Sequence, residues 1–492
     1  MRTPVLLALA LLAPSLGRAQ NPPAATPVDL SGKSDASILN VLRVVARHQI
    51  QPLKDGDYTP VETAEARDAA RQPQGIQWNY PWGVTLYGVL RSTDATGDTE
   101  ARDFVLEHNR IVARYYAWLS ATNAKVGIPA DLRPMVPGQP PPMRGPGNGQ
   151  QRGPGQGGPA GQAQVAPGQG APGGQGQFAP GQGGPGQGGP GAMRGPGGMR
   201  SRNAIRGLMV LGNLDNCGAM GVELLEGALR YPDTVTAEEK VVLERVADWI
   251  ANKQERLPDG THWRPFNRDD MRQWPAGTVW ADDLYMGSPY LVRWAQFTQD
   301  GKYLTDAAHQ VINMAARLQD TDGMWFHAYS EPKKEHSPCK WGRANGWIMV
   351  TEVEILSAMP ENHPDRDRLL DIYRKHVAGV KSVQADSGMW RQVLNEKDLW
   401  EETSCTAMFA YAIARGVNRG WLPASDMAVA RKAFAGICAK AITPEGAVNG
   451  TCAGTGIGLN VEFYQRRPRP DDDMHGRGVV LLAGTEILNP KR

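Results

Sequence analysis

The fold is decided by the stretch ETSCTAMFAYAIARG (residues 402–416), which is small and apolar on almost every side. The closing stretch GRGVVLLAGTEIL (476–488) has the same character. Helices that are apolar all round are buried on every side. By contrast, TAEEKVVLERVADWIANKQE (236–255) and residues 365–384 carry apolar residues on one helical face and charged residues on the other. The chain therefore combines buried helices with amphipathic helices that cover them.

Helical periodicity dominates outside one Gly/Pro-rich block, and it predicts about twelve helices, near residues 36–50, 82–94, 100–121, 206–230, 236–254, 280–298, 303–318, 342–357, 364–384, 403–419, 424–441 and 477–488. Polar aromatic segments precede the apolar helices at regular intervals: Trp341 lies midway along the sequence between Trp280 and Glu402. Such a repeat indicates stacked or ring-closed helical hairpins. Six hairpins would form an all-α (α/α)6 barrel, with the polar segments at one mouth of its inner ring.

The first residues are typical of a secretory signal, with Arg2, an apolar run over 5–12 and a small-x-small site at 17–19. We therefore expect residues 1–19 to be a signal peptide and the protein to be exported, either periplasmic or secreted. Retention as an uncleaved anchor is the alternative. No later stretch is apolar enough to cross a bilayer, so we expect no membrane span.

Residues 137–202 consist largely of Gly, Pro and Gln. They cannot bury enough apolar surface to offset the entropy cost of ordering. A collagen helix needs Gly at every third position, and residues 156–164 break that phase. We predict a disordered Gly/Pro-rich insertion within a single barrel domain formed by residues 34–136 and 203–492. A linker between two domains is the alternative.

Charge and cysteine content argue against several classes of partner. The net charge is +2, but seven arginines lie in the expected signal peptide and the Gly/Pro block, which leaves −5 for the rest. The folded part therefore shows no sign of nucleic-acid binding. The five cysteines have no metal-ligand spacing and allow at most two internal disulfides, so buried free thiols are the favoured interpretation. We expect no metal and no organic cofactor.

Aromatic faces beside carboxylates and a few cations suit a carbohydrate cleft, and the polar segments offer Asp215, Asp282, Asp283, His327, Arg343, Asn345, Glu401, Glu402, Asp471–Asp473 and His475. Each has a structural alternative, because tryptophans at helix starts are commonly core residues and acids in a first turn commonly cap a helix. Neighbouring helical residues diverge by about 100°, so Asp282 and Asp283 cannot both face one cavity.

The segments TVWADDLYMGSPYL (278–291), KWGRANGW (340–347) and DDDMHGRGVVLLAGTEIL (471–488), in this order, resemble the unsaturated rhamnogalacturonyl hydrolases of glycoside hydrolase family 105, with the unsaturated glucuronyl hydrolases of family 88 as relatives. The resemblance runs from about residue 36 to the end, except for the Gly/Pro block. It implies an (α/α)6 barrel. It also implies a substrate whose terminal uronic acid carries a C4=C5 double bond. An acid protonates C4, water adds at C5, and the resulting hemiketal opens and releases the sugar.

The resemblance assigns the role of acid and base to Asp282, whose apolar surroundings are expected to keep it protonated near neutral pH. Substrate binding is implied for matched positions: Asp215, His327, Trp341, Arg343 and, on looser spacing, His262. An arginine suits a uronate because its planar fork binds a carboxylate through two hydrogen bonds. The Gly/Pro block and the loop at Trp263 and Arg264 have no counterpart in the family pattern.

The expected partner is therefore an unsaturated uronyl oligosaccharide derived from the rhamnogalacturonan of pectin. Two alternatives stay open: another (α/α)6-barrel glycan hydrolase or lyase, and a non-catalytic glycan-binding barrel. A hydrolase of the expected kind removes the ultraviolet absorbance of the enol ether, a lyase creates it, and a binding protein leaves it unchanged.

Overall fold

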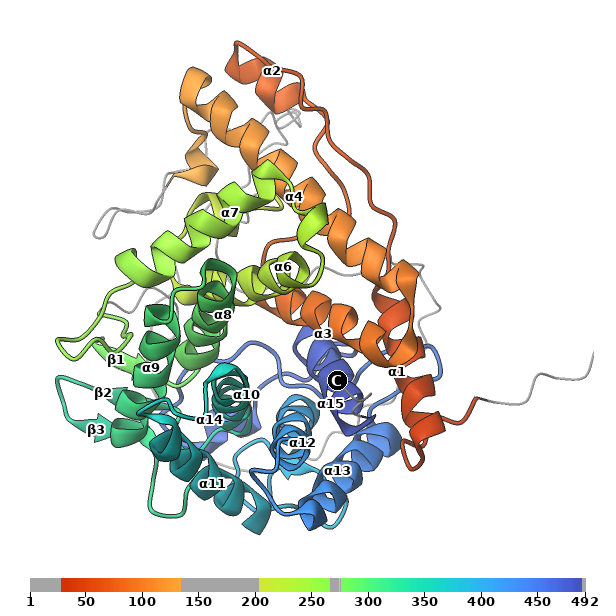
Figure 1. The fold of residues 1–492 in the computed structure, drawn as a ribbon, viewed down its shortest axis with the longest axis vertical. Coiled ribbons are helices and arrows are strands. Elements are labelled where there is room, and N and C mark those ends of the chain that lie inside the picture. Colours follow the sequence, from red (N-terminus) through yellow and green to blue (C-terminus); the bar gives the residue numbers. More distant parts are fainter. Residues whose placement is uncertain (1–27, 134–202, 266–273, 275, 489–492) are drawn as a thin grey trace, which may run out of the picture.

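The computed structural model describes residues 28–133, 203–265, 274 and 276–488. Within them, six helices form a closed inner ring (Figure 1): α3 (Tyr80–Thr96), α6 (Gly218–Arg230), α8 (Asp283–Thr298), α10 (Gly342–Ala358), α12 (Thr403–Asn418) and α15 (Met474–Leu488). Six others lie outside this ring: α1 (Asp35–Gln49), α4 (Thr99–Val126), α7 (Ala237–Asp248), α9 (Lys302–Leu318), α11 (Arg366–Ser382) and α13 (Met427–Lys440). The all-α (α/α)6 barrel predicted from the repeat is confirmed.

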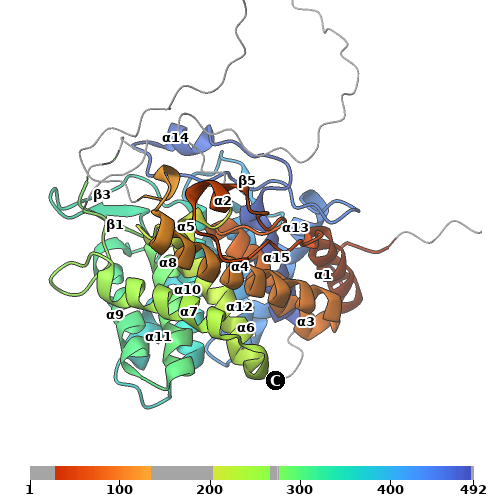
Figure 2. The ribbon, with the colours of Figure 1, turned by 90° about the horizontal axis from the view of Figure 1, so that it is seen from above.

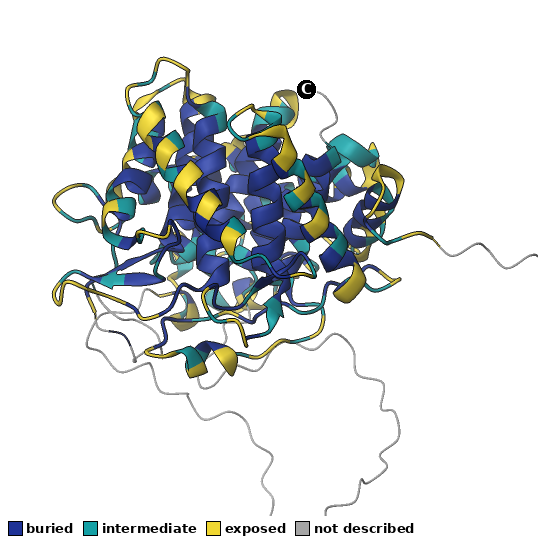
Figure 3. Cartoon of the chain, turned by 90° about the horizontal axis from the view of Figure 1, so that it is seen from below, coloured by how far each residue is buried: buried dark blue, intermediate teal, exposed yellow. Residues whose placement is uncertain are grey.

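The two rings differ in burial as their composition predicts. Every residue of α10 from Gly342 to Leu356 is buried, whereas α11 buries a stripe that includes Leu369, Tyr373 and Val380. Figure 3 shows the same contrast, with dark blue inner helices and exposed faces on the outer ones. The ring closes where α15 packs on α3, and there a Cβ added at Gly88 would lie 2.6 Å from the Cα of Gly478. Glycine at this position therefore permits the closest approach between the first and last inner helices.

Short strands and loops gather at the end of the barrel where the inner helices begin (Figure 2). One antiparallel sheet contains β1 (Thr278–Trp280), β2 (Ala328–Ser330) and β3 (Glu335–His336), and a second pairs β4 (Trp390–Arg391) with β5 (Glu401–Glu402). The short helices α2 (Ala64–Ala69), α5 (Arg206–Met209) and α14 (Val461–Gln465) complete the connections. Because Trp280 pairs with Ala328 in the first sheet, the start of α8 lies beside the segment that carries His327.

One predicted helix is wrong. The sequence predicts a single helix over residues 206–230, but the chain forms α5, a short 3-10 turn η2 (Leu214–Asn216) and then α6. The side chain of Asn213 accepts a hydrogen bond from the backbone N–H of Asn216 and so competes with a continuous helix. The break places Asp215 in a turn at the mouth instead of within a helix.

Two predicted segments cannot be compared with the structure, whereas two further predictions can be. The predicted signal peptide and the Gly/Pro insertion lie outside them. All five cysteines are described, and all are buried free thiols. In the part of the chain that the structure describes, no helix combines the length and apolarity needed to cross a membrane.

A ring of alternating charges closes the other end of the barrel, and we call it the charge ring; in the order of the helices it consists of Arg91, Glu226, Arg293, Glu354, Arg415 and Glu486. Arg293 lies 2.8 Å from Glu226 and 2.7 Å from Glu354. Arg415 lies 2.7 Å from Glu486 and 4.0 Å from Glu354, and Arg91 lies 3.8 Å from Glu226. Burial would raise the pKa of Glu354, but Arg293, Arg415 and Arg91 lower it to about 2. The inner helices thus meet through compensated charges.

Candidate active site

The mouth of the barrel separates the two neighbouring aspartates at the start of α8. The Oδ2 atom of Asp282 lies 3.1 Å from Nε2 of His327, while the carboxylate of Asp283 forms a buried ion pair with Arg264. Asp283 is fully buried, and Asp282 retains 9% of its surface exposed. The divergence predicted from helical geometry is therefore confirmed, and Asp282 is the aspartate of this pair with access to the mouth.

His327 is fully buried and held by four side chains. Trp280 donates its indole N–H to Nε2 at 2.9 Å, the Tyr464 hydroxyl lies 2.8 Å from Nδ1, and the ring of Trp341 lies 4.6 Å away between centroids. The Nε2 atom therefore lies between the indole N–H of Trp280 and the carboxyl of Asp282. The contacts around His327 thus fix its ring beside Asp282.

Arg264 lies between the carboxylates of Asp215 and Asp283 and forms an ion pair with each. The sequence analysis did not assign Arg264 to the site. Its guanidinium donates to Asp283 and Asp215 and lies 4.0 Å over the ring of Trp280. It reaches this place through an isolated antiparallel bridge with Thr278, the first residue of β1. No signal in the sequence identifies such a short bridge.

Asp215 responds to this cluster electrostatically. Burial raises its pKa to about 6, helped by the charges of Asp283 and Asp282 and opposed by Arg264. Its side chain keeps 26% of its surface exposed, so Asp215 lies at the edge of the mouth and not beneath it. Asp215 therefore changes charge near pH 6.

Replacing Asp215 with Asn is expected to flatten the pH dependence of stability. Between the ordinary value of 3.8 and about 6, the folded chain holds a proton on Asp215 that the unfolded chain has lost, so this group makes the free energy of unfolding fall as the pH rises. Denaturant unfolding from pH 4 to pH 7 measures the effect, with the exposed Asp233→Asn as the matched control. Identical slopes for Asp215→Asn and the wild type would contradict the assignment.

Arg343 and Trp341 begin α10 and are both buried, at 1% exposure each. The terminal nitrogens of Arg343 donate to the backbone carbonyls of Cys452 at 2.5 Å and Ala453 at 2.9 Å. Its guanidinium also lies 4.7 Å over the ring of Trp341. The structure thus shows that Arg343 holds the loop 451–458 across the mouth. Its planar guanidinium, which the sequence predicts to bind a uronate, binds two backbone carbonyls in this structure.

Glu402 has the capping role that the sequence offers as its structural alternative. Its carboxylate accepts the backbone N–H of Cys405 at the start of α12 and the backbone N–H of Cys452 at 2.9 Å. Glu402 is fully buried and lies 3.8 Å from Arg343. Together these two residues, of opposite charge, fix the same loop.

His262 lies apart from the other predicted residues. It is fully buried against Gly287 of α8, where a Cβ would lie 3.1 Å from the imidazole Cε1. Burial, aided by Arg256, lowers its pKa to about 3. Among the described residues, neither ring nitrogen has a hydrogen-bond partner. A direct role for His262 in substrate binding stays a prediction.

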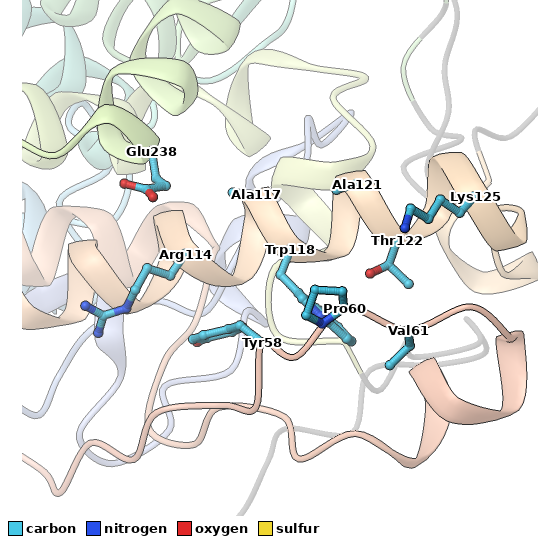
Figure 4. A pocket seen from close by; sticks show the side chains of 10 residues that line it. All are labelled: Tyr58, Pro60, Val61, Arg114, Ala117, Trp118, Ala121, Thr122, Lys125 and Glu238. Carbon is cyan, nitrogen blue, oxygen red and sulfur yellow. The ribbon is translucent and has the colours of Figure 1, made fainter.

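A hollow lies outside the barrel wall, between α4 and the segment 58–61 (Figure 4). It has a volume of about 460 Å³ and is lined by Tyr58, Pro60, Val61, Arg114, Ala117, Trp118, Ala121, Thr122, Lys125 and Glu238. Its cations already have partners, since Arg114 pairs with Asp55 at 2.6 Å and Lys125 with Glu62 at 2.8 Å. Its lining contains no acid–histidine pair, so we assign the chemistry to the mouth of the barrel.

The closed double ring of helices places the protein in the class of (α/α)6 barrels, here with an acid and a histidine at the mouth. The sequence profile of Glycosyl Hydrolase Family 88 matches residues 213–490, more than half of the chain. The protein therefore belongs to this family.

Known relatives agree with this assignment. The chain is 32% identical over 220 residues to the unsaturated 3S-rhamnoglycuronyl hydrolase of Alteromonas sp. (strain LOR), and the match covers 42% of this chain and about half (51%) of that protein. It is 26% identical over 249 residues to the unsaturated rhamnogalacturonyl hydrolase YesR of Bacillus subtilis (strain 168), covering 50% of this chain and 70% of that one. A crystal structure of a possible GH105 member from Klebsiella pneumoniae subsp. pneumoniae MGH 78578 has a TM-score of 0.61 at 20% identity, covering 97% of this chain and 99% of that one. This last likeness shows a shared fold.

Proposed function

We propose that this protein is an exported hydrolase that removes a C4=C5 unsaturated uronic acid from the non-reducing end of rhamnogalacturonan oligosaccharides derived from pectin. The support for the reaction is the arrangement Trp280–His327–Asp282, which places the carboxyl of Asp282 beside a buried histidine at the mouth. The two relatives described above are named for substrates that contain rhamnose, which supports this sugar class. The N-terminal signal pattern supports export.

The proposed reaction starts with transfer of the Asp282 proton to C4 of the enol ether. The positive charge that develops at C5 is stabilised by the ring oxygen, and water then adds there. The hemiketal opens and releases the neighbouring sugar. No carboxylate nucleophile is needed, so the distance rules for retaining and inverting glycosidases do not apply.

The mouth suits an anionic sugar. The six inner helices begin there, and helix N-termini carry partial positive charge that favours a carboxylate. Arg264 and Arg343 lie at the same end, where they offset the charges of nearby carboxylates: Asp215 and Asp283 for Arg264, and Glu402 for Arg343. We propose that the uronate binds between these cations, with Asp215 at the edge of its site and Trp341 beneath His327.

The decisive experiment is an absorbance assay with purified unsaturated disaccharides from rhamnogalacturonan, chondroitin and ulvan. The proposed function requires the enol absorbance to fall on the rhamnogalacturonan fragment. A rise in absorbance on intact polysaccharide would instead show a lyase. Binding without any change in absorbance would show a glycan-binding barrel.

Replacing Arg343 with Lys is expected to raise KM about tenfold while kcat changes little, because one ammonium cannot hold two carbonyls in the geometry of a planar guanidinium. The loop 451–458 would lose one of its two contacts with residue 343. Steady-state kinetics measures this effect, with Arg374→Lys on the outer helix α11 as the matched control. An unchanged KM would remove Arg343 from the substrate site.

A further inference from the structure

The first and last polar segments of the sequence meet at the closure of the barrel. Tyr80 begins α3 and His475 lies in the first turn of α15, and the Tyr80 hydroxyl is 2.5 Å from Nε2 of His475. On the other side of the imidazole, Nδ1 forms a short hydrogen bond with Oδ1 of Asp473. Asp473 is buried at 1% exposure. The three side chains form a continuous chain of hydrogen bonds, which we call the Tyr80 relay.

The partners of His475 fix its tautomer. Asp473 is an acceptor, because it also receives the backbone N–H of His475 at 3.0 Å. The Nδ1 atom must therefore carry the proton, which leaves Nε2 with a lone pair that accepts the Tyr80 hydroxyl. Burial and the nearby Arg343 lower the pKa of His475, so the imidazole is neutral at neutral pH. Although burial opposes it, the hydrogen bonds from His475 and the charge of Arg343 lower the pKa of Asp473, which stays a carboxylate.

Tyr80 is the first residue of α3 and Asp282 directly precedes α8, so both lie at the end of the barrel where the inner helices begin. Burial raises the pKa of Tyr80, and the charges of Asp215, Asp282 and Asp473 add to this rise while Arg343 opposes it. A Cβ added at Gly454 would lie 3.9 Å from the Tyr80 hydroxyl and 3.8 Å from Nε2 of His475, so the loop 451–458 passes directly over the relay. The hydroxyl donates to His475 and keeps oxygen lone pairs free to accept from a ligand.

We propose that Tyr80 accepts a proton from the water that adds at C5 and passes its own hydroxyl proton to His475, so that the acid and the base of the reaction are different residues. This inference rests on the proposed hydration. His475 and Asp473 are positioning residues: they hold the acceptor for the Tyr80 proton.

The protons and electrons balance. The π electrons of C4=C5 form the new C4–H bond with the proton from Asp282, and a water lone pair forms the C5–O bond. One water proton moves to the Tyr80 oxygen as the original Tyr80 proton moves to Nε2 of His475. The Asp473 carboxylate stabilises the imidazolium that results, as an aspartate does in a catalytic triad. Exchange with solvent then returns a proton to Asp282 and removes one from His475.

The test compares Tyr80→Phe with Tyr290→Phe in the full-length protein. Tyr80→Phe removes one hydroxyl, and kcat is expected to fall about 10²-fold with KM within about threefold, as for loss of an acid–base group. The Tyr290 hydroxyl donates to the carbonyl of Leu243, away from the mouth, so Tyr290→Phe is expected to keep wild-type kcat.

A double variant separates the relay from a structural role. Asp473→Asn offers an amide N–H to Nδ1, which shifts the proton to Nε2 and blocks acceptance from Tyr80. Its kcat is expected to fall as in Tyr80→Phe, and the double variant is expected to fall no further, because residues that act as a unit are not additive.

The outcomes distinguish the two proposals. No turnover of any unsaturated uronyl substrate by the wild type overturns both. Turnover by the wild type with an unchanged kcat in Tyr80→Phe overturns the relay alone, as does a rise in KM without a loss of kcat. Additive losses in the double variant also overturn the relay.

Discussion

Replacing Asp282 with Asn is expected to abolish turnover while the fold and most of the substrate affinity survive. The amide preserves the shape of the side chain beside His327, 3.1 Å away, but it cannot deliver a proton to C4. Positioned acid–base groups contribute about 10²- to 10⁴-fold to rate, and we expect a loss in this range. Loss of enol absorbance under single-turnover conditions measures the rate, and thermal unfolding checks the fold.

Asp283→Asn is the matched control for this prediction. Asp283 is fully buried and ion-paired with Arg264, so removal of its charge is expected to cost roughly 3 kcal/mol of stability, the order seen when a buried pair is broken. The two variants should therefore have different effects. Asp282→Asn is expected to lose rate and keep stability, whereas Asp283→Asn is expected to lose stability. Near-wild-type turnover in Asp282→Asn would show that another group is the acid.

Replacing Arg293 with Met is expected to cause the largest loss of stability in the barrel. Arg293 is 3% exposed and is the shared partner of Glu226 and Glu354 in the charge ring. Its removal leaves two buried carboxylates with fewer partners, and breaking a buried charge pair typically costs about 3–5 kcal/mol. Denaturant unfolding at pH 7 measures this loss.

The pH dependence provides a second check on Arg293→Met. In the wild type the pKa of Glu354 lies below its ordinary value, so this group stabilises the fold above that value and the stabilisation is lost as the pH falls toward 2. Without Arg293 this benefit shrinks, and the variant should lose less stability on acidification. The control is Arg431→Met, which removes an exposed pair with Asp35 and should cost less than about 1 kcal/mol. Equal losses in the two variants would contradict a structural role for the charge ring.

The sequence predicts the architecture well because the signal repeats. Helices that are apolar on every side, preceded by polar aromatic segments at quasi-regular intervals, have few alternatives to a ring of hairpins. The helix predicted over 206–230 is wrong because a side-chain hydrogen bond to Asn213 competes with the backbone, and helical periodicity does not register such a local effect.

The site is less predictable, because it depends on contacts that no local pattern encodes. The motif positions bring Asp282, His327 and Trp341 together, since each lies directly before an inner helix or before a strand that packs beside one. Arg264 joins them through an isolated bridge, and Tyr464 through the short helix α14. The pairing of Tyr80 with His475 requires the ring to close between the two ends of the folded chain, which only the tertiary structure shows.

The charge ring also restricts how many hairpins the barrel can contain. Its signs alternate from each inner helix to the next, and an alternating circle closes without conflict only when its members are even in number. A barrel of five or seven hairpins would place two like charges on neighbouring, partly buried positions at the seam, which is unfavourable. Gain or loss of one hairpin by duplication or deletion is therefore penalised, whereas a change by two preserves the parity. The buried end of the barrel, away from the chemistry, thus limits the routes by which such a fold can grow or shrink in evolution.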